Sequence, residues 1–325
     1  MSSGAAILRV SDLSRVVVTE PILHMPKMVP GNYGTSTVDV IVPYATPAAQ
    51  KPLPPKNSTV TFDKTPIPWN KNPIDRKDVP VSIPPEVTFT NRNKLLKMLY
   101  IFMFAPSRYN YYNTDLTFKV SRVGDVIYFL DGPLGEDPGP MTDDKGVPLV
   151  GTEGRFGVPF EKLVCANANA AVDKYFIFQS YTLLAEIDLL VRAEVDCVTP
   201  DPKGTGIGLL TEIKSKKNSN NPSYPIWMDK DYFRTVWAQM LFGCTESLVI
   251  GAYNLNSAGD VATFDDIRQM PFDQVAYYAD MLTDDKYLPP LTGLVALLKW
   301  IRDHTRSGDN KTFSYSVGGQ LFTLA

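Results

Sequence analysis

The sequence has few of the residues on which histidine and cysteine chemistry depends. It contains two histidines, His24 and His304, and neither lies in a recognisable motif. Its three cysteines, Cys165, Cys197 and Cys244, form no C-x-x-C pair. We therefore expect buried thiols in a reducing compartment rather than disulfides or a zinc site. A serine–histidine or zinc–histidine mechanism is disfavoured.

Long apolar runs and a strong net charge are also missing. No run of about 18 apolar residues exists, which argues against a membrane-spanning helix, and the first residues lack the pattern of a secretory signal. The net charge of −3 argues against a protein that coats nucleic acid by bulk electrostatics. It leaves open an enzyme with a local basic channel. We expect a location in the nucleus or cytoplasm, without membrane attachment.

Proline is concentrated at the start of the chain, where about half of the 27 prolines lie in the first 90 residues. Proline fixes φ and removes a backbone donor, so this region should be extended and rich in loops. We expect an extended, flexible leader over residues 1–35 and one catalytic domain over 36–325. Within that domain, residues 36–90 form a proline-rich segment that wraps the core.

Regular structure is expected from residue 90 onward. Apolar spacing predicts helices, and alternation predicts strands with a hairpin turn at 123–124. The expected helices cover 90–104, 158–170, 231–243, 272–282 and 291–304. The expected strands lie within 115–131, 174–198 (two strands), 206–215 and 246–254. Without a βαβα order, this predicts an α+β fold: a single domain with mixed, largely antiparallel β-sheets flanked by helices.

One segment places ionisable residues on otherwise apolar strand sequence: RAEVDCVTPDPKGTGIGLLTEIKSKK, residues 192–217. Glu194 and Asp196 lie in one expected strand, and Glu212 and Lys214 lie in the next. Side chains two residues apart on a strand point to the same face, so each pair projects together. If the two strands are neighbours, all four groups share one patch.

This patch has two interpretations. In one, Lys214 bridges to Glu194 or Asp196 on an exposed sheet face. In the other, the apolar flanking stretches LLVRA and IGLL indicate buried strands, and carboxylates buried together need cations to neutralise them. Mg²⁺ or Mn²⁺ prefers such oxygen ligands, and a pair of these ions can clamp the oxygens of a phosphoryl displacement. We favour metal-dependent phosphodiester chemistry.

An acidic residue on one strand followed by E-x-K on the next is similar to the PD-(D/E)XK nuclease superfamily. Five segments make a more specific resemblance: FTNRNKLLKML, GVPFE, AEVDCVTPD, LLTEIKSKK and FRTVWAQMLFG. Their order and spacing, from about Phe89 to Tyr253, resemble the successive motifs of the decapping exoribonuclease (DXO) family. The resemblance implies a PD-(D/E)XK nuclease-like core.

The resemblance implies a role for each matching position. Two divalent cations, Mg²⁺ or Mn²⁺, would be bound by four carboxylates: Glu161, Glu194, Asp196 and Glu212. The Ile213 carbonyl would be an extra ligand. Lys214 would lie at the attacking water. Arg92 would contact the RNA 5′ end or its phosphates, and Gln239 would help position the scissile region. The implied catalytic set is Glu194, Asp196, Glu212 and Lys214.

Three of these residues also have ordinary structural interpretations. Arg92 can be a solvated residue in the first turn of a helix. Glu161 can compensate a helix dipole, and Gln239 can be a boundary residue at the edge of an apolar stripe.

In the family, the substrates are RNAs with incomplete or non-canonical 5′ ends: unmethylated guanosine caps, 5′ triphosphates and NAD-type caps. Several members then digest RNA 5′→3′, and a 5′→3′ exoribonuclease is an expected partner, so the protein would be a monomer or a heterodimer. The alternatives are a nuclease acting on DNA or structured nucleic acid, and a non-catalytic partner that stabilises an exoribonuclease.

The sequence departs from the family pattern beside two of its motifs. Asn91 and Asn93 replace the tryptophan and glycine that usually flank the arginine. Pro159 stands where a positive charge is usual. These changes leave the expected metal ligands intact and affect the region that would recognise the 5′ end.

Overall fold

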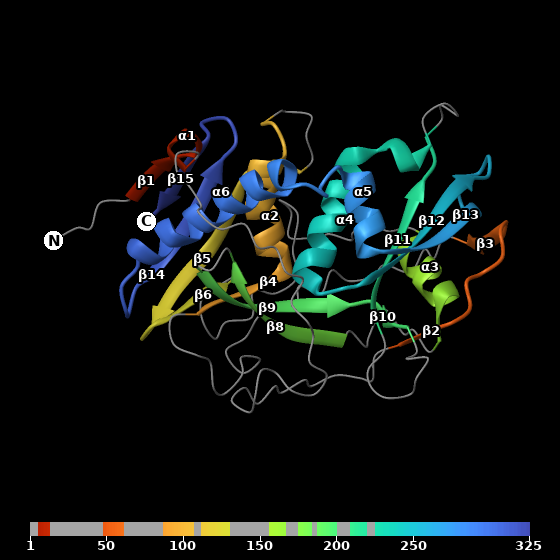
Figure 1. The fold of residues 1–325 in the computed structure, drawn as a ribbon, viewed down its shortest axis with the longest axis horizontal. Coiled ribbons are helices and arrows are strands. Elements are labelled where there is room, and N and C mark those ends of the chain that lie inside the picture. Colours follow the sequence, from red (N-terminus) through yellow and green to blue (C-terminus); the bar gives the residue numbers. More distant parts are fainter. Residues whose placement is uncertain are drawn as a thin grey trace.

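The computed structural model describes nine stretches of the chain, which together form two sheets joined by helices (Figure 1). The described residues are 6–13, 48–61, 87–106, 112–130, 156–166, 175–183, 187–199, 209–219 and 225–325. Most of the expected leader and much of the proline-rich segment therefore lie outside the described residues, as does the glycine-rich stretch 203–208.

The first sheet of the described residues has eight strands. In spatial order they are β1 (Ala6–Arg9), β15 (Leu321–Leu324), β14 (Asn310–Ser316), β5 (Leu116–Val123), β6 (Val126–Leu130), β4 (Thr88–Asn91), β9 (Ile187–Val195) and β8 (Tyr175–Leu183). The pairs β4–β6 and β4–β9 are parallel and the others are antiparallel. The β5–β6 hairpin turns at Gly124, which has a φ of 59°, as the sequence predicts.

The second sheet has seven strands. Their order is β3 (Ser58–Thr61), β13 (Val261–Pro271), β12 (Ser247–Leu255), β11 (Leu210–Lys217), β10 (Cys197–Val198), β2 (Ala49–Gln50) and β7 (Cys165–Ala166). The pairs β11–β12 and β10–β2 are parallel. Strands β2 and β3 belong to the proline-rich segment; β3 lies at one edge of this sheet, and β2 lies between β10 and β7.

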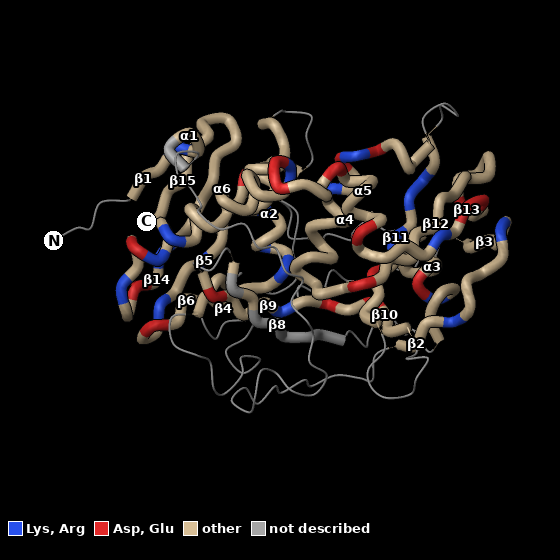
Figure 2. Tube along the Cα trace, viewed as in Figure 1, with Lys and Arg blue, Asp and Glu red and all other residues tan. Residues whose placement is uncertain are grey.

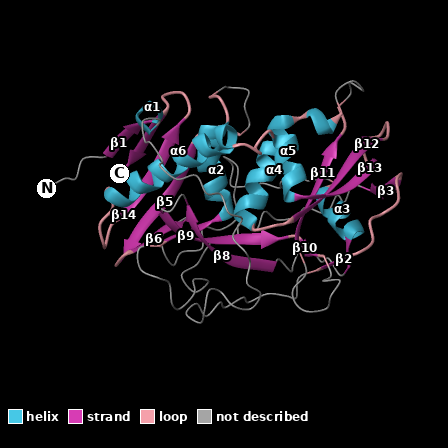
Figure 3. Ribbon diagram, viewed as in Figure 1, coloured by secondary structure: helices cyan, strands magenta, loops and turns pink. Residues whose placement is uncertain are grey.

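The helices lie along the two sheets (Figure 3). They are α1 (Val10–Leu13), α2 (Arg92–Met103), α3 (Gly157–Val164), the 3₁₀ turn η2 (Ile226–Met228), α4 (Lys230–Gly243), α5 (Phe272–Ala279) and α6 (Asp284–Asp303). Asn91 caps α2, because its Oδ1 accepts a hydrogen bond from the Lys94 N–H at 2.9 Å. Among the described residues, none of the helices combines the length and apolar character that crossing a bilayer requires.

Two apolar clusters lie on opposite faces of the β11–β13 sheet. The larger cluster joins α2, α4, α5 and α6 to both sheets and includes Trp237, Leu248 and Ile250. The smaller cluster packs α3 against the other face, where the Phe160 and Phe264 rings stack at 4.4 Å. The helical layer between the two sheets fixes how they sit relative to each other.

This architecture confirms an α+β fold with mixed, largely antiparallel sheets and flanking helices. One expectation is wrong: the strand carrying Glu194 is not a neighbour of the strand carrying Glu212. β9 belongs to the first sheet, and only the short continuation β10 pairs with β11. The chain also continues past α6 into the β14–β15 hairpin, whose strands are not among those expected from the sequence.

Candidate active site

The chain passes from one sheet to the other at Asp196, and the candidate site lies at this crossing. β9 ends at Val195 in the first sheet, and β10 begins at Cys197 in the second. Glu194, on β9, therefore belongs to one sheet, whereas the residues after Asp196 belong to the other. Figure 2 shows acidic and basic positions close together along the trace where β9 leads into β10.

Asp196 is fixed against β11 by a backbone hydrogen bond. β10 runs antiparallel to β11, with Cys197 opposite Thr211. This register places Asp196 beside the E-x-K segment, and the Ile213 N–H donates to Asp196 Oδ2 at 2.7 Å. The sheet crossing thus brings together Asp196 and Glu212, which lie on different strands.

Glu212 is completely buried and is paired with two cations. Arg92 Nη1 donates to Glu212 Oε2 at 2.8 Å, and Lys214 Nζ donates to Glu212 Oε1 at 2.5 Å. Burial alone would raise the pKa of Glu212, but the charges of Arg92 and Lys214 outweigh it and lower the pKa to about 2. The Glu212 carboxylate is therefore ionised at neutral pH.

Asp196 lacks such compensation. Burial, reinforced by the negative charge of Glu212, raises the pKa of Asp196 to about 7, although Lys214 acts in the opposite direction. Burial would lower the pKa of Arg92, but Glu212, Asp196 and then Glu194 raise it above its ordinary value. All three carboxylates thus act electrostatically on one arginine.

The donor set suits a divalent cation. Carboxylates are the ligands that Mg²⁺ and Mn²⁺ prefer, and a buried carboxylate such as Asp196, whose charged form is disfavoured, gains from a nearby positive ion. Among the described residues, no three His, Cys, Asp or Glu side chains form a ready-made metal cage. The reason is visible at Glu212, whose oxygens face Arg92 and Lys214 instead.

Two further predicted residues, Glu161 and Gln239, lie on helices. Glu161 is in α3, which packs against β11 on the face opposite Glu212, through Phe160 and Ile213. Gln239 lies on α4, and its buried Oε1 atom has no hydrogen-bond partner among the described residues.

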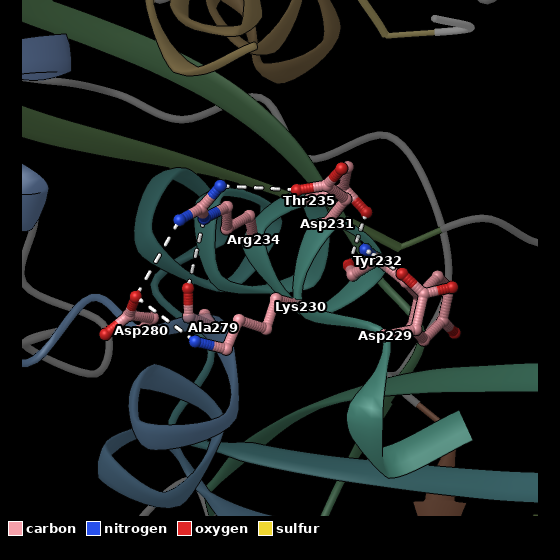
Figure 4. A network of polar contacts seen from close by, with 8 residues as sticks. All are labelled: Asp229, Lys230, Asp231, Tyr232, Arg234, Thr235, Ala279 and Asp280. Atoms are coloured by element: carbon pink, nitrogen blue, oxygen red, sulfur yellow. Dashed lines mark hydrogen bonds and ion pairs between the residues drawn. The ribbon is translucent and has the colours of Figure 1, made fainter. Parts of the chain in front are cut away.

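Helix α4 is anchored at its start, where a network of polar contacts holds it (Figure 4). Asp229 caps the helix, its Oδ1 accepting from the Tyr232 N–H at 3.0 Å. Arg234 Nε donates to the carbonyl oxygen of Ala279, at the end of α5, at 3.2 Å. These contacts hold in place the helix that carries Gln239.

Sequence reasoning missed Tyr100, which lies on α2 within the apolar stripe and whose hydroxyl donates to the Thr235 carbonyl of α4 at 3.4 Å. Its position in the stripe gives no polar signal, since tyrosines at such positions commonly pack as hydrophobic residues. The aromatic segment 108–113 lies largely outside the described residues. Its described member Tyr112 packs edge-on against the Tyr100 ring at 5.9 Å.

The fold, rather than the sequence, shows which known proteins this chain resembles. No family model matches the sequence, and no curated protein matches it. The overall fold is that of solved structures of Rai1 proteins, so the expected resemblance to the decapping exoribonuclease family is confirmed for the fold.

The similar structures are those of fungal Rai1 proteins. S. pombe Rai1 in complex with 3′-FADP has 14% identity and a TM-score of 0.64, and 99% of each chain is covered. Scheffersomyces stipitis Rai1 has 14% identity and a TM-score of 0.53 over 75% of this chain and 67% of that one. Candida albicans Rai1 in complex with pU5-Mn²⁺ has 12% identity and a TM-score of 0.50 over 75% and 69%.

Proposed function

We propose that this protein is a metal-dependent RNA 5′-end hydrolase that removes incomplete or non-canonical caps: unmethylated guanosine caps, 5′ triphosphates and NAD-type caps. The observation that carries the proposal is the convergence of Arg92, Asp196, Glu212 and Lys214 at the crossing between the sheets. The complexes of similar structures with 3′-FADP and with pU5-Mn²⁺ support a nucleotide or RNA ligand and a divalent cation.

The divalent cations of this proposal are held by the carboxylates of Glu194, Asp196 and Glu212. Glu161 and the Ile213 carbonyl complete the expected ligands. When bound, the ions supply positive charge to the attacking and leaving oxygens of a phosphoryl displacement. The proposal includes two bound ions, which are Mg²⁺ or Mn²⁺.

Lys214 and Arg92 supply the fixed positive charge. Burial would lower the pKa of Lys214, but Glu212 and Asp196 raise it, so the ammonium stays protonated. It can orient the attacking water and offset charge that develops on the phosphate. The guanidinium of Arg92 can bind two phosphate oxygens at once, and Gln239 positions the scissile region.

Digestion of the RNA body in the 5′→3′ direction and association with a 5′→3′ exoribonuclease are further parts of the proposal. Both follow from the family resemblance, and the protein would then act as a monomer or as one half of a heterodimer. A pull-down with purified exoribonuclease tests the partner independently of catalysis.

A paired assay tests the activity. The protein and a Glu212→Ala variant are given 5′-triphosphate, GpppG-capped, NAD-capped, 5′-monophosphate and circular RNAs, with Mg²⁺ or Mn²⁺ and then with EDTA. Glu246→Ala is the matched control, because Glu246 is an exposed glutamate just before β12. We expect release from linear 5′ ends that needs metal, is lost in Glu212→Ala and persists in Glu246→Ala.

Other outcomes would change the function assigned to the site. Cleavage of circular RNA or of DNA would identify an endonuclease. Loss of all turnover with intact folding, together with binding to an exoribonuclease, would identify a non-catalytic partner. Release that is equal in Glu212→Ala and the parent protein would contradict the proposed site.

A further inference from the structure

Gly243, the last residue of α4, leaves the space that the Arg92 guanidinium occupies. A Cβ atom placed on Gly243 would lie 2.8 Å from Arg92 Nη1 and 3.6 Å from Arg92 Cδ. Contacts under 3.0 Å are essentially never made by real Cβ atoms. The same Nη1 atom donates to Glu212 at 2.8 Å, so it lies between the α4 backbone and a carboxylate.

The backbone of Gly243 does not require glycine. The left-handed residue at this helix end is Cys244, with a φ of 51°. Gly243 itself is not one of the described glycines with positive φ. Alanine forms helices better than glycine does, so the backbone alone would favour alanine here. The close approach of Arg92 is the feature that only glycine allows.

The last turn of α4 is held by several hydrogen bonds, whereas the atom that a larger residue would meet is the end of a flexible side chain. The Cys244 N–H donates to the carbonyl oxygens of Leu241 and Met240. The Thr245 N–H donates to the Met240 carbonyl at 3.1 Å, and the Tyr181 hydroxyl donates to the Leu241 carbonyl at 3.0 Å. A side chain at 243 would therefore displace the arginine rather than the helix.

The same helix end favours a positive charge. The C-terminus of a helix carries a partial negative charge, which attracts cations within the last turn. Arg92 reaches this end from the first turn of α2, where Asn91 caps the helix. The guanidinium therefore has two anionic neighbours, the C-terminal turn of α4 and the Glu212 carboxylate.

We propose that Gly243 is the positioning residue for Arg92: it admits the guanidinium to the C-terminal turn of α4, where Arg92 can meet the phosphates of an RNA 5′ end. The substrate contact rests on the function proposed above, whereas the steric coupling of Gly243 to Arg92 does not.

A double-mutant cycle in thermal stability tests the coupling without any substrate. Gly243→Ala is made in the parent protein and in an Arg92→Ala background. In the parent we expect a drop in melting temperature of roughly 2–6 °C from overpacking. In the Arg92→Ala background the clash is gone, and we expect no drop or a small rise, because alanine is the better helix former.

Gly293→Ala is the matched control. Gly293 lies in α6, and a Cβ there would meet the Phe102 ring at 2.5 Å, away from Arg92. It should lower the melting temperature equally in both backgrounds. An equal drop for Gly243→Ala in both backgrounds would overturn the proposal. If Gly243→Ala alone fails to fold, folding of Gly243→Ala/Arg92→Ala supports the proposal, and failure of the double variant overturns it.

Kinetics separate positioning from a general loss of structure. With 5′-triphosphate RNA, Gly243→Ala should raise KM roughly tenfold with a smaller change in kcat. The inhibition constant of 5′-hydroxyl RNA for Gly243→Ala should stay within about twofold of the value for the parent protein, because a 5′-hydroxyl end offers no phosphate to Arg92. If both change together, the positioning role is wrong. The stability coupling can be found while Arg92→Ala binds and hydrolyses RNA normally. In that case Gly243 still provides the space for Arg92, but the substrate role given to Arg92 is wrong.

Discussion

The two faces of strand β11 are equally buried but contain opposite chemistry. Ile213 is 3% exposed and packs with Phe160 and Phe264 beneath α3. Glu212, one residue earlier, is 0% exposed and points to the face where Leu248 joins the large core. The apolar face is stabilised by removal of its surface from water, whereas the polar face depends on two cations held at fixed positions.

This difference between the two faces of β11 shows which face can carry a functional site. A buried apolar side chain needs only to fit, whereas a buried carboxylate is tolerated only with its partners in place. The cations that neutralise Glu212 in this structure are the same groups that the proposed function needs for RNA phosphate. Changes on the two faces should therefore affect stability in both cases, but activity only on one.

Removing the negative charge of Glu212 should have the largest effect on the free energy of unfolding. Glu212→Gln leaves Arg92 and Lys214 buried beside a neutral group, and we expect unfolding in urea to show a loss of about 3–5 kcal/mol. Ile213→Val, on the other face, should cost about 0.5–1.5 kcal/mol. A gain in stability for Glu212→Gln would mean that this ion-pair network costs more than it contributes.

Two lysines on the same face of β11 should differ in catalysis. Lys214 contacts Glu212, whereas Lys216 pairs with Asp229 and lies over the Tyr232 ring. Lys214→Met should lower kcat by about 10²-fold or more, measured with the best 5′-end substrate. Lys216→Met should stay within roughly tenfold, as expected for a change outside the reacting groups. Equal losses would remove the special role of Lys214.

Divalent cations should stabilise the protein through the polar face. At about 100 times the dissociation constant, Mn²⁺ or Mg²⁺ should add about 2.7 kcal/mol to the free energy of unfolding, and EDTA should remove the gain. Differential scanning calorimetry measures this shift. It should vanish in Glu212→Gln and persist in Ile213→Val; a shift that survives in Glu212→Gln would place the ion elsewhere.

Overpacking the apolar face should have the smallest effect and spare catalysis. A Cβ on Gly251 would meet the Phe160 and Phe264 rings at 2.6 Å, so Gly251→Ala should cost about 1–3 kcal/mol. The activity per folded molecule should stay unchanged, in contrast to Gly243→Ala. Active-site titration combined with urea unfolding distinguishes the two glycines, and a loss of activity in folded Gly251→Ala would show that the two faces are coupled.

Local patterns predicted the elements because their signals are local. The apolar spacing of α2 with Asn91 as its cap, the turn at Gly124 and the stripe of α4 all matched the structure within a few residues. Strand β13 and the β14–β15 hairpin were not predicted. Polar residues interrupt the apolar alternation of β13 and begin β14, and β15 has only four residues. Their pairing therefore depends on neighbouring strands.

The candidate site was predicted as a set of residue types but not as a geometry. E-x-D and E-x-K spacing placed each pair on one face, yet the expected adjacency of the two strands was wrong. The chain changes sheets at Asp196, which local periodicity does not encode. The pairing of Glu212 with Arg92, 120 residues away in the sequence, likewise depends on how α2 packs on α4.

The sequence by itself determined which residues could do chemistry, because carboxylates and lysines on apolar strands are too costly to bury without a purpose. It also determined the helices and strands that carry them, since their periodicity is a local property of the chain. Only the tertiary structure decided that Asp196 meets β11 through a sheet crossing, and that Gly243 leaves room for Arg92. The first depends on a change of sheet that local periodicity does not encode, and the second joins segments far apart in the chain. Only the packing of whole elements fixes contacts of these kinds.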